Sequence, residues 1–556
     1  MFLRKHVVSR GEKRYVSYRL CRTVRKGGTV RQEIVANLGK LSDREAERIG
    51  RQLLALAGKL PPEGAEPQQG LSYLYGGPLL VQTLMELAQW EPLLRPLGET
   101  RRRLDLYRTL TVALCAQLLA PGSELQTTEW QRQLVFTREP YAIPYHHFLS
   151  ALDVLADCHP ALEDGLFARV THLFNQKVDL VFYDLTSSYF EGAGPADLAR
   201  RGYSRDGRPD CPQIVVGLAV TKDGFPFAWR VHPGNTVDVK TMEAMTEDFR
   251  RRFPIDRCLI VGDSGLLSEE AAERMRALGL RYLMGLRAAN NDLAQQAIAA
   301  THDQAPAGQI GEVTYWPPQL CDGKAYIVLH SPGRHAKTRA IAQRKLEAVR
   351  PKLQQLERDV RAGKVRTEAT IAARATRILV QAKATPLFES EVGPRHFAWR
   401  ERLAKLEAIE QDGGKYVLQT NELTLQAAEA VMAYRQLEVV EDGFRRLKDT
   451  LRLRPLYHRT AHRVLGHVGL CVLALFLLRL LEQRLLAASL CHSAEKALAS
   501  VQELRAVEVS LPTGPVWPLP YVSPTSAAIF RALGITDPKA RFKADLQTLE
   551  EPPTPA

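Results

Sequence analysis

The fold of this chain is decided by the stretch Val178-Asp179-Leu180-Val181-Phe182-Tyr183-Asp184-Leu185-Thr186-Ser187-Ser188-Tyr189-Phe190. Five of the six residues from Leu180 to Leu185 are β-formers or apolar, and the sixth is Asp184. A continuous apolar run of this length is typical of a strand buried on both faces of a sheet. A carboxylate inside such a strand costs free energy unless a cation pairs with it. Asp184 is therefore interpreted either as the cap of a turn at Thr186 or as a metal ligand that the strand holds rigidly.

The segments after this stretch predict a mixed α/β sheet. In order they are strands 213–220 and 225–232, a helix from about 239 to 253, strand 258–262, helix 268–278 and strand 282–286. The short turn Thr221–Gly224 makes the second and third strands an antiparallel hairpin. By analogy, the order β-β-β-α-β-α-β is that of a ribonuclease-H-like five-stranded sheet, in which the first and fourth strands are neighbours. Asp263 ends the fourth strand, so we expect it beside Asp184, although the two are 79 positions apart (263 − 184).

The composition indicates a soluble protein of several domains with an anionic partner. The chain has 556 residues, of which 45% are hydrophobic and 25% charged, as is ordinary for globular proteins. Its 75 Lys and Arg residues exceed its 62 Asp and Glu residues, for a net charge of +13, which favours a nucleic acid partner over a merely basic enzyme. The eight cysteines form no CxxC pair, which argues against a zinc finger or a disulfide framework and indicates a reducing cytoplasm.

The apolar segments predict no membrane partner. The N-terminus is charged and lacks the apolar core of a signal peptide. The longest apolar run, Val468 to Leu478, is shorter than the roughly 20 residues that a spanning helix needs. We expect it to be part of a buried core helix from about 461 to 486.

Six segments are expected along the chain. They are a basic N-terminal hairpin and helix (1–60), a mainly helical region (71–177), the first part of the core (178–288), an insertion domain (289–413), the second part of the core (414–488) and a Pro-containing tail (489–556). The helical region should hold four helices, the last from about 147 to 174. The tail is expected to be loosely packed, apart from a helix near 527–533.

A basic stretch lies inside the insertion. Residues 334–366 hold eleven Lys and Arg against three Asp and Glu, with Pro351 as an expected kink. We interpret this stretch either as a solvated helical hairpin or as an arm that faces DNA.

A predicted helix from about 424 to 451 carries further charged residues. Four of its residues share one stripe, because they are spaced 7, 4 and 3 positions apart: Tyr434, Glu441, Arg445 and Lys448. Glu441 and Arg445 are interpreted either as a surface ion pair or as part of a stripe directed at the sheet edge that carries the two aspartates. The second arrangement would bring three carboxylates together beside cations.

Three carboxylates beside cations suit metal-dependent chemistry on phosphodiesters. Mg²⁺ prefers hard oxygen ligands and keeps several waters. Two such ions roughly 3.5–4 Å apart can activate an attacking oxygen and stabilise a leaving one at phosphorus. A glycosidase with a carboxylate pair is disfavoured, because the basic charge suits phosphates better than sugars.

These residues resemble the DDE transposases of bacterial insertion sequences. The likeness rests on Asp184 in YDLTS, on Asp263 in VGDSG, and on Glu441 in the helix of a branch marked by Y-x2-R-x3-E-x6-K. That branch has a long insertion before the glutamate, and here 178 positions separate Asp263 from Glu441 (441 − 263). The similarity extends over most of the chain, through GYSRDGRPD (202–210), HPGNT (232–236), RPLYH (454–458) and ANLG (36–39).

The resemblance implies a cut-and-paste transposase. Asp184, Asp263 and Glu441 would be the catalytic residues and would bind two Mg²⁺ ions, for which Mn²⁺ would substitute. The enzyme would cleave double-stranded DNA at terminal inverted repeats and join the freed 3′-hydroxyl to target DNA, as a homodimer in a synaptic complex. No membrane and no small-molecule substrate is implied, and the setting would be the bacterial cytoplasm, at the nucleoid when DNA is bound.

The same resemblance implies a set of residues that contact DNA. They are Tyr434, Arg445, Lys448, Arg205 and Arg208. The helical region 71–177 would recognise the inverted repeats. Trp316 in the insertion is a candidate for stacking on a flipped base, with a packed tryptophan as the alternative.

One position departs from the family's pattern. The arginine of the motif falls on Leu437, and Arg435 lies about 120° round the helix from Glu441, which makes it a poor substitute. Two other functions stay open. One is a ribonuclease-H-like nuclease without strand transfer, and the other is a catalytically weakened, transposase-derived DNA-binding protein, for which Leu437 is the hint.

Overall fold

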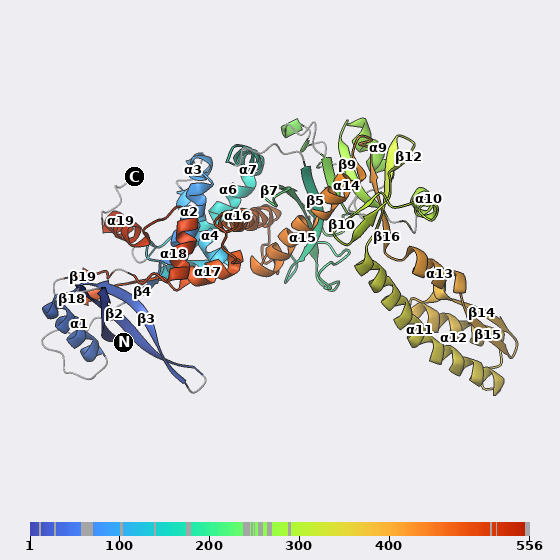
Figure 1. Cartoon of the computed structure of the whole chain (residues 1–556), viewed down its shortest axis with the longest axis horizontal. Helices are drawn as coiled ribbons and strands as arrows, with labels where there is room; N and C mark the ends of the chain where they lie inside the picture. The colour runs from blue at the N-terminus through green and yellow to red at the C-terminus, as the bar shows by residue number, and fades with distance from the viewer. Residues whose placement is uncertain are drawn as a thin grey trace. The chain divides into compact units, whose positions relative to one another are not determined.

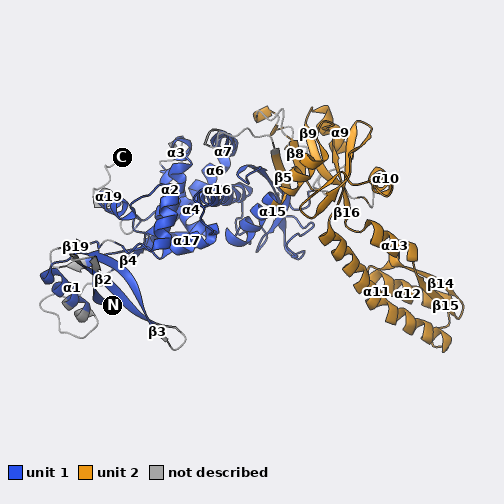
Figure 2. Ribbon diagram, viewed as in Figure 1, with its two compact units in different colours: residues 1–178, 185–236, 439–556 blue, residues 179–184, 237–438 orange. Residues whose placement is uncertain are grey.

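The chain forms two compact units (Figure 2). The computed structural model describes residues 1–10, 13–26, 29–56, 71–99, 104–137, 141–173, 180–236, 245, 248–249, 251–253, 259–263, 269–286, 288, 291–511, 514–518 and 520–550. Unit 1 consists of Met1–Val178, Leu185–Thr236 and Val439–Ala556, and unit 2 of Asp179–Asp184 and Val237–Glu438. Strand β5 (Leu180–Tyr189) begins in unit 2 and continues in unit 1.

Unit 2 is organised around a mixed sheet with the hydrogen-bonded order β10-β11-β13-β16-β9-β8-β5 (Figure 1). Besides β5, the strands of this sheet that lie in unit 2 are β8 (Leu259–Gly262), β9 (Arg281–Leu286), β10 (Gly308–Ile310), β11 (Val313–Tyr315), β12 (Gln319–Cys321), β13 (Lys324–His330) and β16 (Lys415–Thr420). β8 is parallel to both β5 and β9, whereas β16 pairs antiparallel with β9 and β13. The helices beside this sheet are α9 (Glu269–Ala277), α10 (Asp292–Ala300) and α14 (Ala427–Arg435).

The strand order confirms that the first and fourth strands of the predicted core are neighbours. In unit 1, β5 continues beside β6 (Gln213–Thr221), which pairs antiparallel with β7 (Pro226–Pro233). The first strand is therefore flanked by the second and the fourth, as expected for a ribonuclease-H-like core. The sheet is larger than the predicted five strands, because the insertion adds strands of its own next to β16. The predicted helix 239–253 lies mostly outside the described residues.

The basic part of the insertion folds as a helical subdomain. It contains α11 (Pro332–Arg361), α12 (Glu368–Gln381), α13 (Leu403–Asp412), β14 (Phe388–Gly393) and β15 (His396–Glu401). Its own core includes Val349, Leu353 and Ile371, each 0% exposed. α11 continues through Pro351, so the proline does not end the helix. Residues 334–366 therefore form almost one continuous helix and not a hairpin by themselves; α11 packs against α12, which follows the stretch, and contact with DNA stays a prediction.

The helices of unit 1 include one long apolar helix, α16 (Ala461–Ala487). The α-helices between residues 71 and 173 are α2 (Gly76–Leu87), α3 (Glu91–Glu99), α4 (Leu106–Leu119), α5 (Glu124–Trp130), α6 (Tyr145–Asp157) and α7 (His159–Leu173). α16 is long and apolar enough to cross a membrane, but 83% of its most apolar window is buried inside the protein. It is the predicted core helix, packed against α2, α4, α6 and β7.

The fourth predicted helix of this region is divided into α6 and α7 around Cys158. Pro160 stands in the first turn of α7. Proline lacks the N–H that would continue the helical ladder, and it is favoured at the start of a helix. Pro160 therefore explains why this segment forms two helices and not the single helix that we expected.

The two ends of the chain pack together within unit 1. β1 (Phe2–Arg10), β2 (Lys13–Lys26) and β3 (Thr29–Gly39) form an antiparallel sheet followed by α1 (Asp43–Leu56). The C-terminal elements are α17 (Ala494–Gln502), β17 (Arg505–Val507), β18 (Val509–Leu511), β19 (Gly514–Val516), α18 (Pro524–Ala532) and α19 (Pro538–Glu550). β17 pairs with β4 (Ser72–Leu74), and Val507 shares a core with Leu20 and Ala36.

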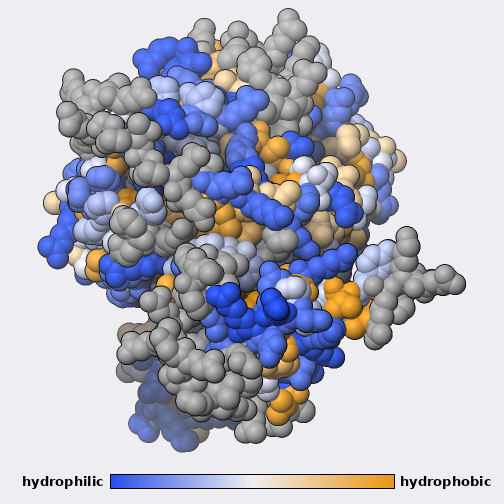
Figure 3. Space-filling view, turned by 90° about the vertical axis from the view of Figure 1, so that its left-hand side faces the viewer, coloured by the Kyte–Doolittle hydropathy of each residue, from blue (hydrophilic) through white to orange (hydrophobic). Residues whose placement is uncertain are grey.

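The tail is thus not loosely packed as predicted. Ile529 and Phe530 of α18 are both 0% exposed, and the expected helix near 527–533 exists within α18. Hydrophobic residues on the face drawn in Figure 3 form small patches separated by hydrophilic ones. The burial of Ile529 and Phe530 helps to hold the C-terminal segment to the rest of unit 1.

Candidate active site

Asp184 and Asp263 are aligned by the parallel pairing of β5 with β8. The register pairs Leu180 with Leu259 and Phe182 with Val261. Continued by two residues, it aligns Asp184 with Asp263, which directly follows the end of β8. Side chains alternate across a sheet and neighbouring strands lie about 4.8 Å apart, so both carboxylates belong to the same side of one sheet edge.

The local structure explains why Asp184 is held rigidly. Val181, Phe182 and Tyr183 are each no more than 1% exposed, which confirms a strand buried on both faces. β5 runs on to Tyr189, so the turn at Thr186 that the capping interpretation requires is not formed. Asp184 itself is half-buried and Asp263 is exposed, which leaves this edge accessible to a ligand.

Tyr434 on α14 holds one of the two aspartates. Its hydroxyl donates a hydrogen bond to Oδ1 of Asp263 at 3.2 Å. Burial, and then the charge of Asp263, raises the pKa of Tyr434 above its ordinary value, so the hydroxyl stays protonated and remains a donor near neutral pH. The helix is positioned for this contact because α14 packs against β8 and β9.

Two residues near Tyr434 were not singled out from the sequence. The ring of Tyr416 lies 6.2 Å from the ring of Tyr434, and the guanidinium of Arg334 lies 4.2 Å from the centre of the Tyr416 ring. Arg334 therefore brings a cation from the first turn of α11 to the neighbourhood of the acidic pair. No spacing rule could find this contact, because Arg334 and Tyr416 are 82 positions apart (416 − 334).

The predicted long helix that carries Glu441 is interrupted. Turn residues 436–437 separate α14 from α15 (Glu438–Arg445), and a π-helical segment, η4 (Arg446–Thr450), follows. Tyr434 and Glu441 therefore do not share one continuous stripe, and Glu441 belongs to unit 1. Leu437, at the position where the sequence motif would have an arginine, is 5% exposed, and a buried leucine is favourable there because a buried cation would need a partner. Arg435 donates instead to the carbonyl of Ile310 at 3.2 Å.

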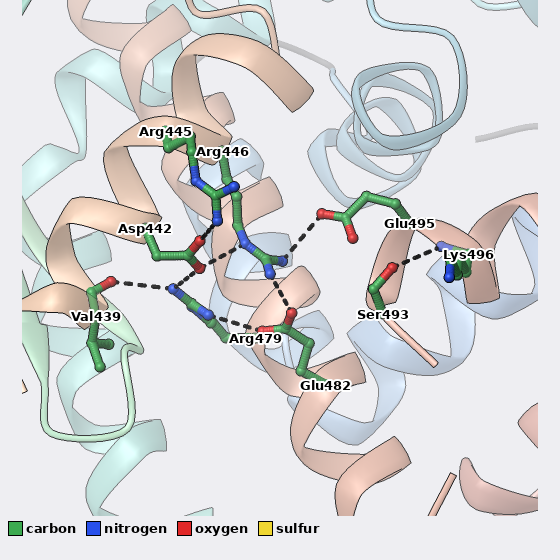
Figure 4. A network of polar contacts seen from close by, with 9 residues as sticks. All are labelled: Val439, Asp442, Arg445, Arg446, Arg479, Glu482, Ser493, Glu495 and Lys496. Carbon is green, nitrogen blue, oxygen red and sulfur yellow. Dashed lines mark hydrogen bonds and ion pairs between the residues drawn. The ribbon is translucent and has the colours of Figure 1, made fainter. Parts of the chain in front are cut away.

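A network of ion pairs anchors α15 beside α16 (Figure 4). Asp442, next to Glu441, accepts hydrogen bonds from Arg446 at 2.9 Å and from Arg479 at 2.7 Å, and it also pairs with Arg445. Burial opposes ionisation of Asp442, but these arginines hold its pKa below the ordinary value. The side chain of Arg445 is still 70% exposed. These ion pairs join α15 to α16 within unit 1.

Lys448, expected at the DNA, is paired inside unit 1. Its Nζ donates to Oδ1 of Asp206 at 2.7 Å, and their side chains are 11% and 2% exposed. Arg454 pairs with the same carboxylate oxygen. Lys448 therefore connects η4 to the loop that carries Arg205 and Arg208.

This loop is attached to β5 just beyond Asp184. The backbone N–H of Arg205 donates to Oγ of Ser187 at 2.9 Å. The guanidinium of Arg208 lies 5.0 Å from the centre of the Tyr189 ring and also pairs with Asp210 at 2.9 Å. Both arginines thus belong to a loop tied to the strand that holds the first carboxylate.

Trp316 lies in a core cluster of unit 2. It is 8% exposed, and its Nε1–H donates to the carbonyl of Gln304 at 3.1 Å. It packs with Tyr326 and Val328, among others. The structure therefore favours the packing interpretation of this tryptophan over a base-stacking one.

Comparison with known proteins identifies the family. A family model described as a transposase DDE domain matches residues 179–477, more than half of the chain. A second model, described as the N-terminal domain of IS1634 family transposases, matches residues 3–66. No curated protein matches the chain.

One solved structure is similar over most of its length. It is the cryo-EM structure of a piggyBac transposase synaptic complex with hairpin DNA, with 9% sequence identity, a TM-score of 0.37, and coverage of 88% of this chain and 89% of that chain.

The two family models carry the identification. DDE transposases act on DNA and generally use divalent metal ions. The chain belongs to the DDE transposase family of bacterial insertion sequences.

Proposed function

We propose that this transposase cleaves DNA at the two ends of an insertion sequence and joins the freed 3′-hydroxyls to target DNA, by a cut-and-paste route. Asp184, Asp263 and Glu441 are its proposed catalytic carboxylates. The observation that carries the proposal is the parallel register of β5 and β8, which aligns the two aspartates on one side of the sheet. Glu441 belongs to the other compact unit, so the strand register says nothing of its position. It is included because the family's motif has three carboxylates.

The residues fit a hard divalent cation. Carboxylate oxygens are the ligands that Mg²⁺ prefers, and Mn²⁺ accepts the same set. Tyr434 fixes the rotation of the Asp263 carboxylate through Oδ1, and β5 fixes the backbone of Asp184. Two Mg²⁺ ions bound there would supply Lewis-acid stabilisation of the attacking and leaving oxygens. The protein's own contribution is to hold the ligands still, because phosphoryl transfer tolerates little misplacement.

The proposed DNA contacts come from three arginines, of which Arg445 is exposed and Arg205 and Arg208 are half-buried. Arg445 and the loop residues Arg205 and Arg208 would bind phosphates beside the carboxylates, and Lys448 would hold that loop through Asp206. The helical region 71–177 would recognise the terminal inverted repeats, with α11 adding salt-dependent contacts. We further propose a homodimer in the synaptic complex and a reaction in the bacterial cytoplasm, at the nucleoid.

A joining assay tests the function. Full-length protein is incubated with Mg²⁺, a labelled duplex that ends in the 3′-hydroxyl terminus of the element carrying the gene, and a target plasmid. The wild type should join the duplex to the plasmid. Asp184→Asn, Asp263→Asn and Glu441→Gln should each lower joining by more than about a hundredfold, since even groups behind metal ligands contribute 10–100-fold.

The matched control is Asp223→Asn, an exposed aspartate in the turn between β6 and β7, which should join normally. Cleavage of the duplex without joining by the wild type would identify a nuclease instead. DNA binding with neither cleavage nor joining would identify a DNA-binding protein derived from a transposase.

A further inference from the structure

Three metal-ligating side chains from distant segments meet inside unit 1. Glu124 is the first residue of α5, His458 precedes α16, and His467 lies on α16. Their ligand atoms all lie within 4.8 Å of one another. Oε1 of Glu124 is 3.5 Å from Nε2 of His458 and 3.8 Å from Nδ1 of His467. The three side chains are only 12–15% exposed.

The surroundings of His467 leave its Nδ1 to face the carboxylate. On the other side of the ring, Nε2 lies 3.8 Å from Sγ of Cys471, and that thiol donates to the carbonyl of Leu451 at 3.9 Å. In the tautomer with Nε2 protonated, Sγ accepts from Nε2–H, as it does from Nε2 of Gln117 at 3.5 Å, and Nδ1 carries a lone pair. Nδ1 is buried and has no hydrogen-bond partner among the described residues. A metal ion between that lone pair and Oε1 of Glu124 would be a partner for both atoms.

We propose that Glu124, His458 and His467 bind a divalent transition-metal ion, Zn²⁺ above others. Bonds of 2.0–2.2 Å in tetrahedral geometry separate ligand atoms by about 3.4 Å. This is close to the 3.5 and 3.8 Å that separate Oε1 of Glu124 from the nitrogens of His458 and His467. Imidazole ligands select zinc-like metals and disfavour Mg²⁺. The contact from Nε2 to Cys471 is the kind of outer-shell interaction that fixes the tautomer of a metal-bound histidine.

The site would connect three parts of unit 1. Glu124 comes from the helical region, His458 from the segment after η4, and His467 from the core helix. A metal bound to all three would hold α5 to α16 and restrain the segment that follows Lys448 and Arg454. Its role is therefore structural and separate from the aspartates of unit 2.

Metal content tests the proposal. Untagged full-length protein is stripped with EDTA, titrated with ZnSO₄ against a competing chelator, and analysed by mass spectrometry for zinc. The wild type should bind about one Zn²⁺ per chain at this site, and Glu124→Gln and His467→Gln should each weaken binding at least about tenfold. Zinc should raise the Tm of the wild type and not of these variants. Absence of zinc above background in the wild type, or unchanged affinity in both variants, would overturn the proposal.

Two control variants separate this site from others. His462 lies on the same helix but is 44% exposed and pairs with Asp157, so His462→Gln should bind zinc as the wild type does. Asp184→Asn should also keep the high-affinity zinc. Loss of that zinc in Asp184→Asn would assign it to the catalytic carboxylates and overturn the proposal.

X-ray absorption of the zinc-loaded wild type provides a test that depends on no variant. Nitrogen and oxygen ligands should give a first shell at about 2.0–2.1 Å. A sulfur shell at about 2.3 Å would make Cys471 a ligand and overturn the proposed set.

Discussion

At the scale of single residues, the role of a side chain in this transposase depends on the partner that the fold gives it. Tyr434 and Lys448 were both expected to contact DNA. Tyr434 donates to Asp263, and Lys448 donates to Asp206. Both side chains are buried or nearly so, and a buried polar group without a partner would cost free energy. Each side chain thus has a protein partner that it can position, and its expected contact with DNA stays a prediction.

Tyr434→Phe should impair the catalytic metal site without disturbing the fold. The Asp263 carboxylate would lose the donor that fixes its rotation, and a hydrogen bond to a charged group contributes about 1.5–3 kcal/mol. We expect joining to be about tenfold slower at low Mg²⁺ and partly restored at high Mg²⁺, measured as initial rates against Mg²⁺ concentration. Tyr416→Phe, a change in the neighbouring ring, serves as the control and should behave as the wild type. Equal rates for Tyr434→Phe and wild type at low Mg²⁺ would contradict this role.

Lys448→Gln and Arg445→Gln should separate positioning from DNA contact. Lys448→Gln leaves the buried Asp206 with Arg454 alone and should lower the free energy of unfolding by about 3 kcal/mol, measured with urea. Arg445→Gln should change stability little and should lower the slope of log Kobs against log salt by about 0.9, because one phosphate contact is lost. If Lys448→Gln changed the slope of log Kobs against log salt and left the free energy of unfolding unaltered, Lys448 would be a direct DNA contact and its positioning role would be wrong.

At the scale of elements, α16 organises unit 1 through close contacts with its neighbours. Gly466 is where α16 meets α6, and a Cβ at this position would lie 2.1 Å from the carbonyl oxygen of Leu152. This clash is with backbone, so the two helices would have to move apart. The break between α14 and α15 is a second feature of this scale, since it separates Tyr434 from Glu441.

Gly466→Ala should therefore destabilise the protein although alanine is the better helix former. Overpacking of this kind costs about 1–3 kcal/mol, or more when backbone must shift. Gly443→Ala in α15 is the matched control, because its nearest side-chain contact would be 3.5 Å, with Leu475. It should be neutral or stabilising by up to about 1 kcal/mol. Urea unfolding of both variants measures the contrast, and equal stabilities would refute the close-packing account.

At the scale of the whole molecule, the helical subdomain is inserted between two paired strands of unit 2. His330 of β13 pairs with Lys415 of β16, and Ser331 N–H donates to the carbonyl of Gly414 at 3.1 Å. The two ends of the subdomain are therefore side by side, and its buried residues form a separate cluster. We therefore expect that the subdomain can be removed without breaking the sheet.

Replacement of residues 332–413 by an Asn-Gly turn should leave the rest of the chain folded. Asn-Gly suits a tight hairpin between β13 and β16. We expect native-like circular dichroism and a Tm within a few degrees of the wild type. Removal of the net +8 of residues 334–366 should also lower the salt dependence of DNA binding. An unfolded variant would contradict the independence of the subdomain, and an unchanged salt slope would contradict its contact with DNA.

The sequence by itself determined the features that depend on local pattern. Apolar runs predicted β5, β8 and α16. The analogy of the element order with a ribonuclease-H-like sheet predicted that Asp184 and Asp263 would be neighbours, and the parallel pairing of β5 with β8 agrees with this. Only the tertiary structure decided the partner of Lys448, the bond from Tyr434 to Asp263, and the meeting of Glu124 with His458 and His467. Those contacts join segments up to several hundred positions apart. No periodicity encodes them, because they depend on how whole elements pack.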